Sequence, residues 1–166
     1  MTILSRIRFL TVKNVPQLFW RSPKALTITP PFISVFVLIF GLVLFGLGEA
    51  LLIAASAGVS PWTTLAEGIN LITGWSVGFA TFVISFFVLL TWIPLRQIPG
   101  IGTILNALIV ASMLDLSLPY LPEPDLYLFQ LLQSLMGILI VGFGAALYLS
   151  ANLGPGPRDG LMTGLT

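Results

Sequence analysis

Hydrophobic and polar positions fall along this chain in blocks. Four apolar blocks are long enough to be membrane-spanning helices, because a hydrocarbon core of about 30 Å needs about 20 helical residues. The pattern predicts an all-α protein, a polytopic transmembrane helical bundle in which some helices are broken. The four predicted spans are Ile33–Ala55, Val77–Ile93, Ile101–Leu118 and Leu126–Ala151.

Prolines and glycines punctuate the joins between these blocks. Pro61 follows Gly58 shortly after the first span, and proline is well tolerated in the first turn of a helix. We therefore expect a short helix over Trp62–Ile72 that ends at Gly74. The second and third predicted spans are short and bounded by such residues, as discontinuous membrane helices are.

Composition supports a membrane location and argues against catalysis. Hydrophobic residues make up 57% of the 166 positions and charged residues only 8%, against about 25% in soluble domains. The chain has neither cysteine nor histidine, which excludes thiolate and imidazole metal ligands and the common nucleophile–histidine pairs. We therefore expect a non-enzyme with no metal and no cofactor.

Charge predicts the orientation of the chain. Five of the seven basic residues precede the first span, within a segment 1–31, and the other two, Arg96 and Arg158, fall on the same predicted side. Positive loops stay in the cytoplasm, so we expect a multi-pass protein of the bacterial inner membrane with a cytoplasmic N-terminus. Segment 1–31 either lies on the anionic membrane surface or is a disordered leader that sets topology.

An internal repeat runs through the chain. Gly41–Ile69 and Gly137–Leu165 align without a gap at a constant offset of 96, and ten of the 29 aligned positions are identical. Five of these matches are glycines, and one pairs Pro61 with Pro157 beyond the end of a long span. Apolar sequences of low complexity produce chance leucine and alanine matches, but rarely this set.

The repeat predicts an inverted architecture. The first unit, residues 32–118, holds three spans, an odd number, so the second copy must lie upside down relative to the first. The second unit, 119–166, is predicted to be incomplete: four spans are present of about six expected. Either the sequence is a fragment or another chain supplies the remaining packing surface.

Small residues spaced by four predict how the first and fourth spans pack. Such spacing lets helix backbones approach closely in membranes. The two repeat-related triplets are Gly46, Ala50 and Ala54, and Gly142, Ala146 and Ser150. We expect these faces to cross at a pseudo-two-fold axis.

Candidate site residues cluster around two predicted helix breaks, at Gly58 with Pro61 and at Gly154 with Pro157. A helix that starts inside a membrane cavity offers free N–H groups to an anionic group. Polar or aromatic side chains follow both breaks. They are Trp62, Thr63, Arg158 and Asp159.

Each charged or polar candidate has a functional and a structural interpretation. Glu49 inside the first span either couples a proton or cation, or is a protonated carboxyl bonded to backbone. Arg158 either holds an anionic group or anchors the chain at the cytoplasmic surface. Asp159 either forms a charge pair with Arg158 at the site or caps a helix. Asn106 in the third span either lines a polar path or bonds another helix.

The quoted motifs resemble one family. The stretches GLGEALLIAASAGVSPWTTLAEGI, WIPLRQIPGIGTILNA and ALYLSANLGPGPRDGLMTGL are similar to the YczE/YitT-type family of bacterial integral membrane proteins. The resemblance implies a duplicated helical inner-membrane protein of about six spans, for which transport or export is inferred from architecture.

Function is therefore expected to be transporter-like. We expect a small molecule or ion to pass through a site between the two breaks. The alternative is a non-transporting membrane scaffold or regulator that acts through partners. The expected partners are the lipid bilayer and a small solute, with no nucleic acid, and a homo-oligomer is left open.

Overall fold

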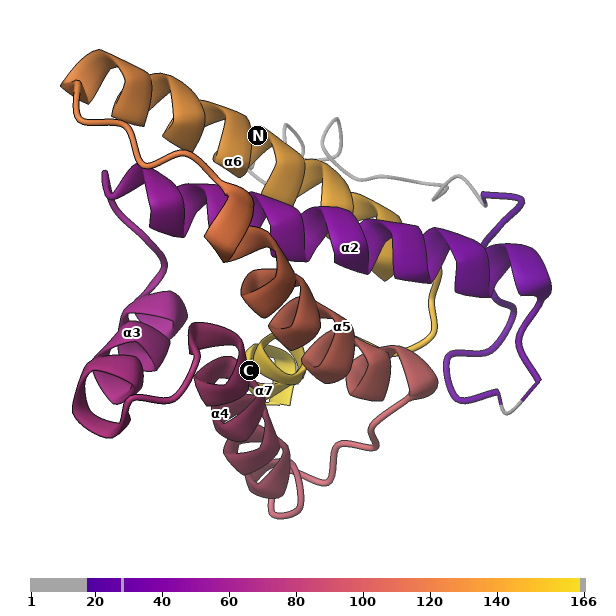
Figure 1. Ribbon diagram of the computed structural model, residues 1–166. Helices are drawn as coiled ribbons and strands as arrows, with labels where there is room; N and C mark the ends of the chain where they lie inside the picture. Colours follow the sequence, from indigo (N-terminus) through magenta and orange to yellow (C-terminus); the bar gives the residue numbers. More distant parts are fainter. Residues whose placement is uncertain (1–17, 28, 165–166) are drawn as a thin grey trace, which may run out of the picture.

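Two long helices form the centre of the fold. The computed structural model describes residues 18–27 and 29–164, and this part of the chain is helical without strands. Figure 1 shows α2 and α6 lying side by side, with α5 crossing beneath them and α3, α4 and α7 also beneath α2, to the left of α5 in this view. The elements are α2 (Phe32–Ala55), α3 (Pro61–Thr73), α4 (Val77–Thr91), α5 (Ile101–Ser117), the 3-10 helix η2 (Leu118–Tyr120), α6 (Tyr127–Ser150) and α7 (Pro157–Gly164).

Three helical segments are long and apolar enough to cross a membrane: α2, α5 continued by η2, and α6. The second predicted span is different. It forms α4, whose 15 residues rise only about 22 Å, and α4 follows α3 with a bend of 117°. The bent pair α3–α4 counts as a fourth span only if it is taken as one broken element.

The short helix after the first break forms as predicted, one residue longer at each end. Pro61 occupies its first turn, and the hydroxyl of Ser60 accepts a hydrogen bond from the backbone N–H of Thr63 at 3.2 Å. This bond satisfies one of the free N–H groups at the helix start. Gly74 ends α3 in the left-handed conformation, at φ 73°, which glycine adopts without steric cost.

Glycines allow α2 and α6 to approach closely. A Cβ built on Gly144 would lie 2.6 Å from the backbone N of Phe45 and 2.7 Å from the carbonyl oxygen of Gly41. At the other end of the contact, a Cβ on Gly48 would lie 3.0 Å from the carbonyl oxygen of Gly137. Neither position has room for a side chain without a shift of the backbone opposite, so the packing favours glycine at both.

The predicted packing of α2 against α6 is correct, but the predicted residues are largely wrong. A Cβ on Gly46 would meet Met113 of α5, whereas one on Gly142 would meet nothing within 4 Å, and Ala146 is exposed. Two positions along a helix correspond to a rotation of about 200°. Gly46 therefore faces away from the side of α2 that carries Gly48.

The remaining members of the triplets differ in their surroundings. Ala50 and Ala54 are buried, whereas the hydroxyl of Ser150 bonds outside the helix pair, accepting a hydrogen bond from the indole N–H of Trp20 at 3.0 Å. A stripe of small residues thus exists on both helices, but only the stripe on α2 is covered.

The two breaks have matching backbones. Ser56 and Asn152 have φ values of 52° and 57°, and Gly58 and Gly154 have φ values of 137° and 110°. Each pair is separated by the 96 positions found in the sequence repeat. Helices α3 and α7 both begin at the proline that follows, Pro61 or Pro157.

The segment before α2 is tied to the end of α6. The backbone N–H of Ser22 donates to the carbonyl of Ala151 at 3.0 Å, and the side-chain amide of Asn152 donates to the carbonyl of Ser22 at 2.8 Å. These bonds satisfy polar backbone groups at a helix end. The predicted surface-binding positions in 1–17 lie outside the described residues.

Candidate functional site

Glu49 is the buried acidic residue at the centre of the candidate site. It lies within α2 with only 6% of its surface exposed. The hydroxyl of Thr63 donates to its Oε2 at 2.7 Å, and Nη1 of Arg158 lies 3.9 Å from its Oε1. One carboxylate therefore joins α2 to residues that follow both helix breaks.

The first break places Thr63 and Trp62 beside Glu49. The chain leaves α2 after Ala55 and turns back at Ser56–Ser60, so the first turn of α3 comes alongside Glu49. Trp62 presents its ring to Arg158, whose guanidinium carbon lies 6.0 Å from the ring centroid. That distance is at the outer limit for a cation–π contact.

The second break places Arg158 and Asp159 in the first turn of α7. Three hydrogen bonds hold this segment against α4 and α5. The indole N–H of Trp92 donates to the carbonyl of Pro157 at 3.1 Å, the hydroxyl of Thr103 donates to the carbonyl of Pro155 at 2.7 Å, and the N–H of Gly102 donates to the carbonyl of Leu153 at 2.7 Å. These bonds fix the position of Arg158.

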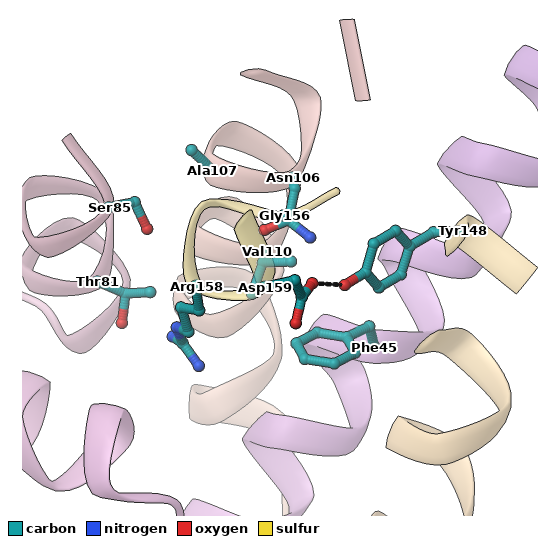
Figure 2. Close-up of a pocket in the computed structure, with 10 residues that line it drawn as sticks. All are labelled: Phe45, Thr81, Ser85, Asn106, Ala107, Val110, Tyr148, Gly156, Arg158 and Asp159. Carbon is teal, nitrogen blue, oxygen red and sulfur yellow. Dashed lines mark hydrogen bonds between the residues drawn. The ribbon is translucent and has the colours of Figure 1, made fainter. Parts of the chain in front are cut away.

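Asp159 has its own partner. Its carboxylate Oδ2 accepts a hydrogen bond from the phenol of Tyr148, near the end of α6 (Figure 2). Tyr148 is 2% exposed and packs edge-on against Phe45 of α2. The two acidic side chains of the site are thus each bonded to a hydroxyl group.

A pocket opens between these groups and helices α4 and α5. Its volume is about 30 Å³, room for a few water-sized groups and much smaller than a typical drug-sized ligand site of about 300–1,000 Å³. Figure 2 shows the side chains that line it. They are Phe45, Thr81, Ser85, Asn106, Ala107, Val110, Tyr148, Gly156, Arg158 and Asp159.

Two hydroxyl groups face this pocket without partners. Thr81 and Ser85 are spaced by four on α4 and therefore share one face of the helix. They are 3% and 5% exposed. Within residues 18–27 and 29–164, neither side chain forms a hydrogen bond, and neither does the amide of Asn106.

The predicted site residues fall into two adjoining groups. Glu49, Trp62, Thr63 and Arg158 contact one another, whereas Asn106 and Asp159 line the pocket beside them. Gly58, Pro61, Gly154 and Pro157 lie at the two breaks, as expected from the sequence. Among the described residues, no group of three or more acidic side chains is close enough to hold a metal ion.

Sequence reasoning missed three hydroxyl-bearing residues of the pocket. Tyr148 is the repeat counterpart of Leu52, so the alignment gave it no weight. Thr81 and Ser85 occur in a strongly apolar block, where hydroxyls commonly bond their own backbone. Their spacing by four within that block was the available signal.

These observations define a polytopic helical membrane protein with a buried polar site. The chain belongs to a family of unknown function, DUF6198, whose model matches residues 32–166. It is 38% identical to an uncharacterized protein of Haemophilus influenzae over 93% of this chain and 70% of the relative. No solved structure matches it.

Two further relatives come from Bacillus subtilis. The uncharacterized membrane protein YczE is 33% identical over 76% of this chain and 60% of its own length. The uncharacterized protein YyaS is 30% identical over 73% of this chain and 62% of its own length. The resemblance to YczE-type membrane proteins is thereby confirmed. The chain spans 60–70% of the length of these relatives.

Proposed function

We propose that this protein is a transporter-like, non-enzymatic membrane protein. A small molecule or ion passes through the site between the two helix breaks. The observation that carries the proposal is the contact of Glu49 with both Thr63 and Arg158, at 2.7 Å and 3.9 Å. Charged groups inside a membrane bundle are costly and commonly mark a solute or ion pathway.

The same proposal includes an inverted repeat of units 32–118 and 119–166. The glycine contacts support it, because they are reciprocal. In space, Gly41 contacts Gly144 and Gly48 contacts Gly137. In the repeat alignment, Gly41 is equivalent to Gly137 and Gly48 is equivalent to Gly144. Exchange of partners in this way is what a pseudo-two-fold axis produces.

Repeat-related positions of the two units are not equally covered. Helix α5 covers Gly46 and, through Gly100 and Thr103, the second break at Gly154. The equivalent positions Gly142 and Gly58 face open space. We propose that further helices of the second unit, as in a longer chain, or a second copy of this chain cover this face.

The proposed location is the inner membrane of a bacterium, with the N-terminus in the cytoplasm. The relatives named above are bacterial, and the excess of basic residues before α2 favours this orientation. The lipid bilayer and a small solute are the proposed partners, and no nucleic acid is among them. Deleting residues 1–17 tests the rival scaffold function, because it removes basic residues but keeps Trp20 and Ser22 against α6.

Single cysteines test the transport proposal, since the chain has none of its own. Thr63→Cys reports on the first break and Asn106→Cys on the pocket. Their exposed neighbours, Thr64→Cys on α3 and Ser112→Cys on α5, are matched controls. We expect membrane-impermeant reagents to reach Thr63→Cys and Asn106→Cys from opposite sides in proportions that shift with a bound solute. Fixed labelling from one side at both positions under all conditions would contradict the proposal.

A further inference from the structure

Arg158 has hydrogen-bond donors that form no hydrogen bond within the described residues. A guanidinium carries five N–H donors, and the contact with Glu49, at 3.9 Å, involves Nη1 alone. Nε and Nη2 have no partner among residues 18–27 and 29–164. In Figure 2 the guanidinium lies on the side of the pocket that faces Thr81 and Ser85. Donors from α4 and α7 therefore converge on the same space.

Each acidic group nearby accepts one hydroxyl. Glu49 accepts the hydroxyl of Thr63 and Asp159 accepts the phenol of Tyr148. Both bonds hold the carboxylates against other helices. Donors of Arg158, Thr81 and Ser85 remain available to a molecule bound in the pocket.

We propose that this pocket binds a small monocarboxylate. Its two oxygens would accept hydrogen bonds from Arg158, because guanidinium and carboxylate match in geometry, and from the hydroxyls of Thr81 and Ser85. This inference rests on the proposed function in that it names the solute class of the same site.

The other walls of the pocket suit a short hydrocarbon chain. Phe45, Ala107 and Val110 line it beside the polar groups, and apolar walls with few polar groups are typical of small-molecule sites. The amide of Asn106 can bond a further oxygen, such as a hydroxyl substituent.

Binding of propionate to the purified chain in lipid nanodiscs tests the inference by calorimetry. Propylammonium chloride and inorganic phosphate, at equal ionic strength, probe the opposite charge and a different oxyanion. Thr81→Val with Ser85→Ala removes both hydroxyls while nearly keeping side-chain shape. Ser112→Ala is the matched control, because Ser112 is exposed and bonds its own helix at Leu108.

We expect saturable propionate binding that weakens about tenfold or more in the double variant and stays unchanged in Ser112→Ala. If the double variant fails to fold, propionate binding is measured on the single variant Ser85→Ala, which should also bind more weakly. Absence of propionate binding by the folded chain, preference for propylammonium or phosphate, or an equal loss in Ser112→Ala overturns the inference.

Two experiments together separate this inference from the transport proposal. Cysteine labelling that shifts between the two sides, without propionate binding, would keep the proposed function and overturn the monocarboxylate. Propionate binding that depends on Thr81 and Ser85, with labelling fixed on one side, would keep the binding site and overturn transport.

Discussion

The carboxylate of Glu49 on α2 lies 3.9 Å from the guanidinium of Arg158 on α7. The two side chains are 8% and 20% exposed, so each depends on the other for neutralisation more than a surface pair does. The pair also connects the two proposed repeat units, because α2 lies in 32–118 and α7 in 119–166.

Removing either charge is expected to destabilise the protein. Glu49→Gln and Arg158→Gln each leave a mostly buried charge without its partner, at a cost of about 3 kcal/mol. The double variant should cost less than the sum of the two. Denaturant titration in mixed micelles, followed by circular dichroism, measures these free energies of unfolding.

Glu123→Gln is the control for this pair, because Glu123 is exposed and has no ion pair among the described residues. It should change the free energy of unfolding by less than about 0.5 kcal/mol. Additive single effects at Glu49 and Arg158 would show that the two charges are not coupled.

Two glycines on α6 should respond in opposite directions to alanine. Gly144→Ala places a Cβ 2.6 Å from the backbone of Phe45, and such overpacking costs about 1–3 kcal/mol. Gly142→Ala meets nothing within 4 Å, so the higher helix propensity of alanine stabilises by up to about 1 kcal/mol. Thermal unfolding of both variants checks this, and equal shifts would contradict the packing of α2 on α6.

The helices and breaks were predictable because local chemistry determines them. Pro61 and Gly74 bound α3 within one residue of the predicted ends. The bend of 117° between α3 and α4 was not predictable, since it depends on hydrogen bonds between Asp115 of α5 and the start of α4. That carboxylate accepts bonds from the hydroxyl of Ser76 at 2.6 Å and the N–H of Gly78 at 2.8 Å.

The site was predictable in its members but not in its contacts. Glu49 and Arg158 attract notice because ionisable groups in apolar blocks are rare. Their pairing depends on the path of α7, which Trp92 and Thr103 direct through bonds to backbone carbonyls. No local pattern encodes such long-range bonds. The packing face of α2 was mispredicted because Gly41 with Gly48, and Gly46 with Ala50, are both valid small-residue patterns.

Trp92→Phe should loosen α7. The indole N–H of Trp92 donates to the carbonyl of Pro157, and Trp92 is 2% exposed. Phenylalanine leaves that buried carbonyl unpaired, at a cost of about 1–3 kcal/mol. We expect lower stability and faster labelling of a cysteine at Asp159. Trp75→Phe is the matched control, because Trp75 is 43% exposed, and comparable effects of the two changes would contradict this role for Trp92.

Adjacent threonines at the start of α3 offer the sharpest test of the site. Thr63 is 2% exposed and donates to Glu49, whereas Thr64 is exposed and donates to the carbonyl of Ser60 at 3.1 Å. Valine keeps the side-chain shape in both cases. Thr63→Val should cost about 1.5–3 kcal/mol, because it removes a hydrogen bond to a charged group, and Thr64→Val less than about 0.5 kcal/mol.

The two threonine variants can be compared in one denaturant titration. Combining Thr63→Val with Glu49→Gln extends the test, because the hydroxyl and the carboxylate act on each other. If the contact exists, Thr63→Val loses most of its effect once Glu49 is replaced. A cost of Thr63→Val that is the same with Glu49 and with Gln at that position would show that Thr63 stabilises α3 alone and does not hold the carboxylate.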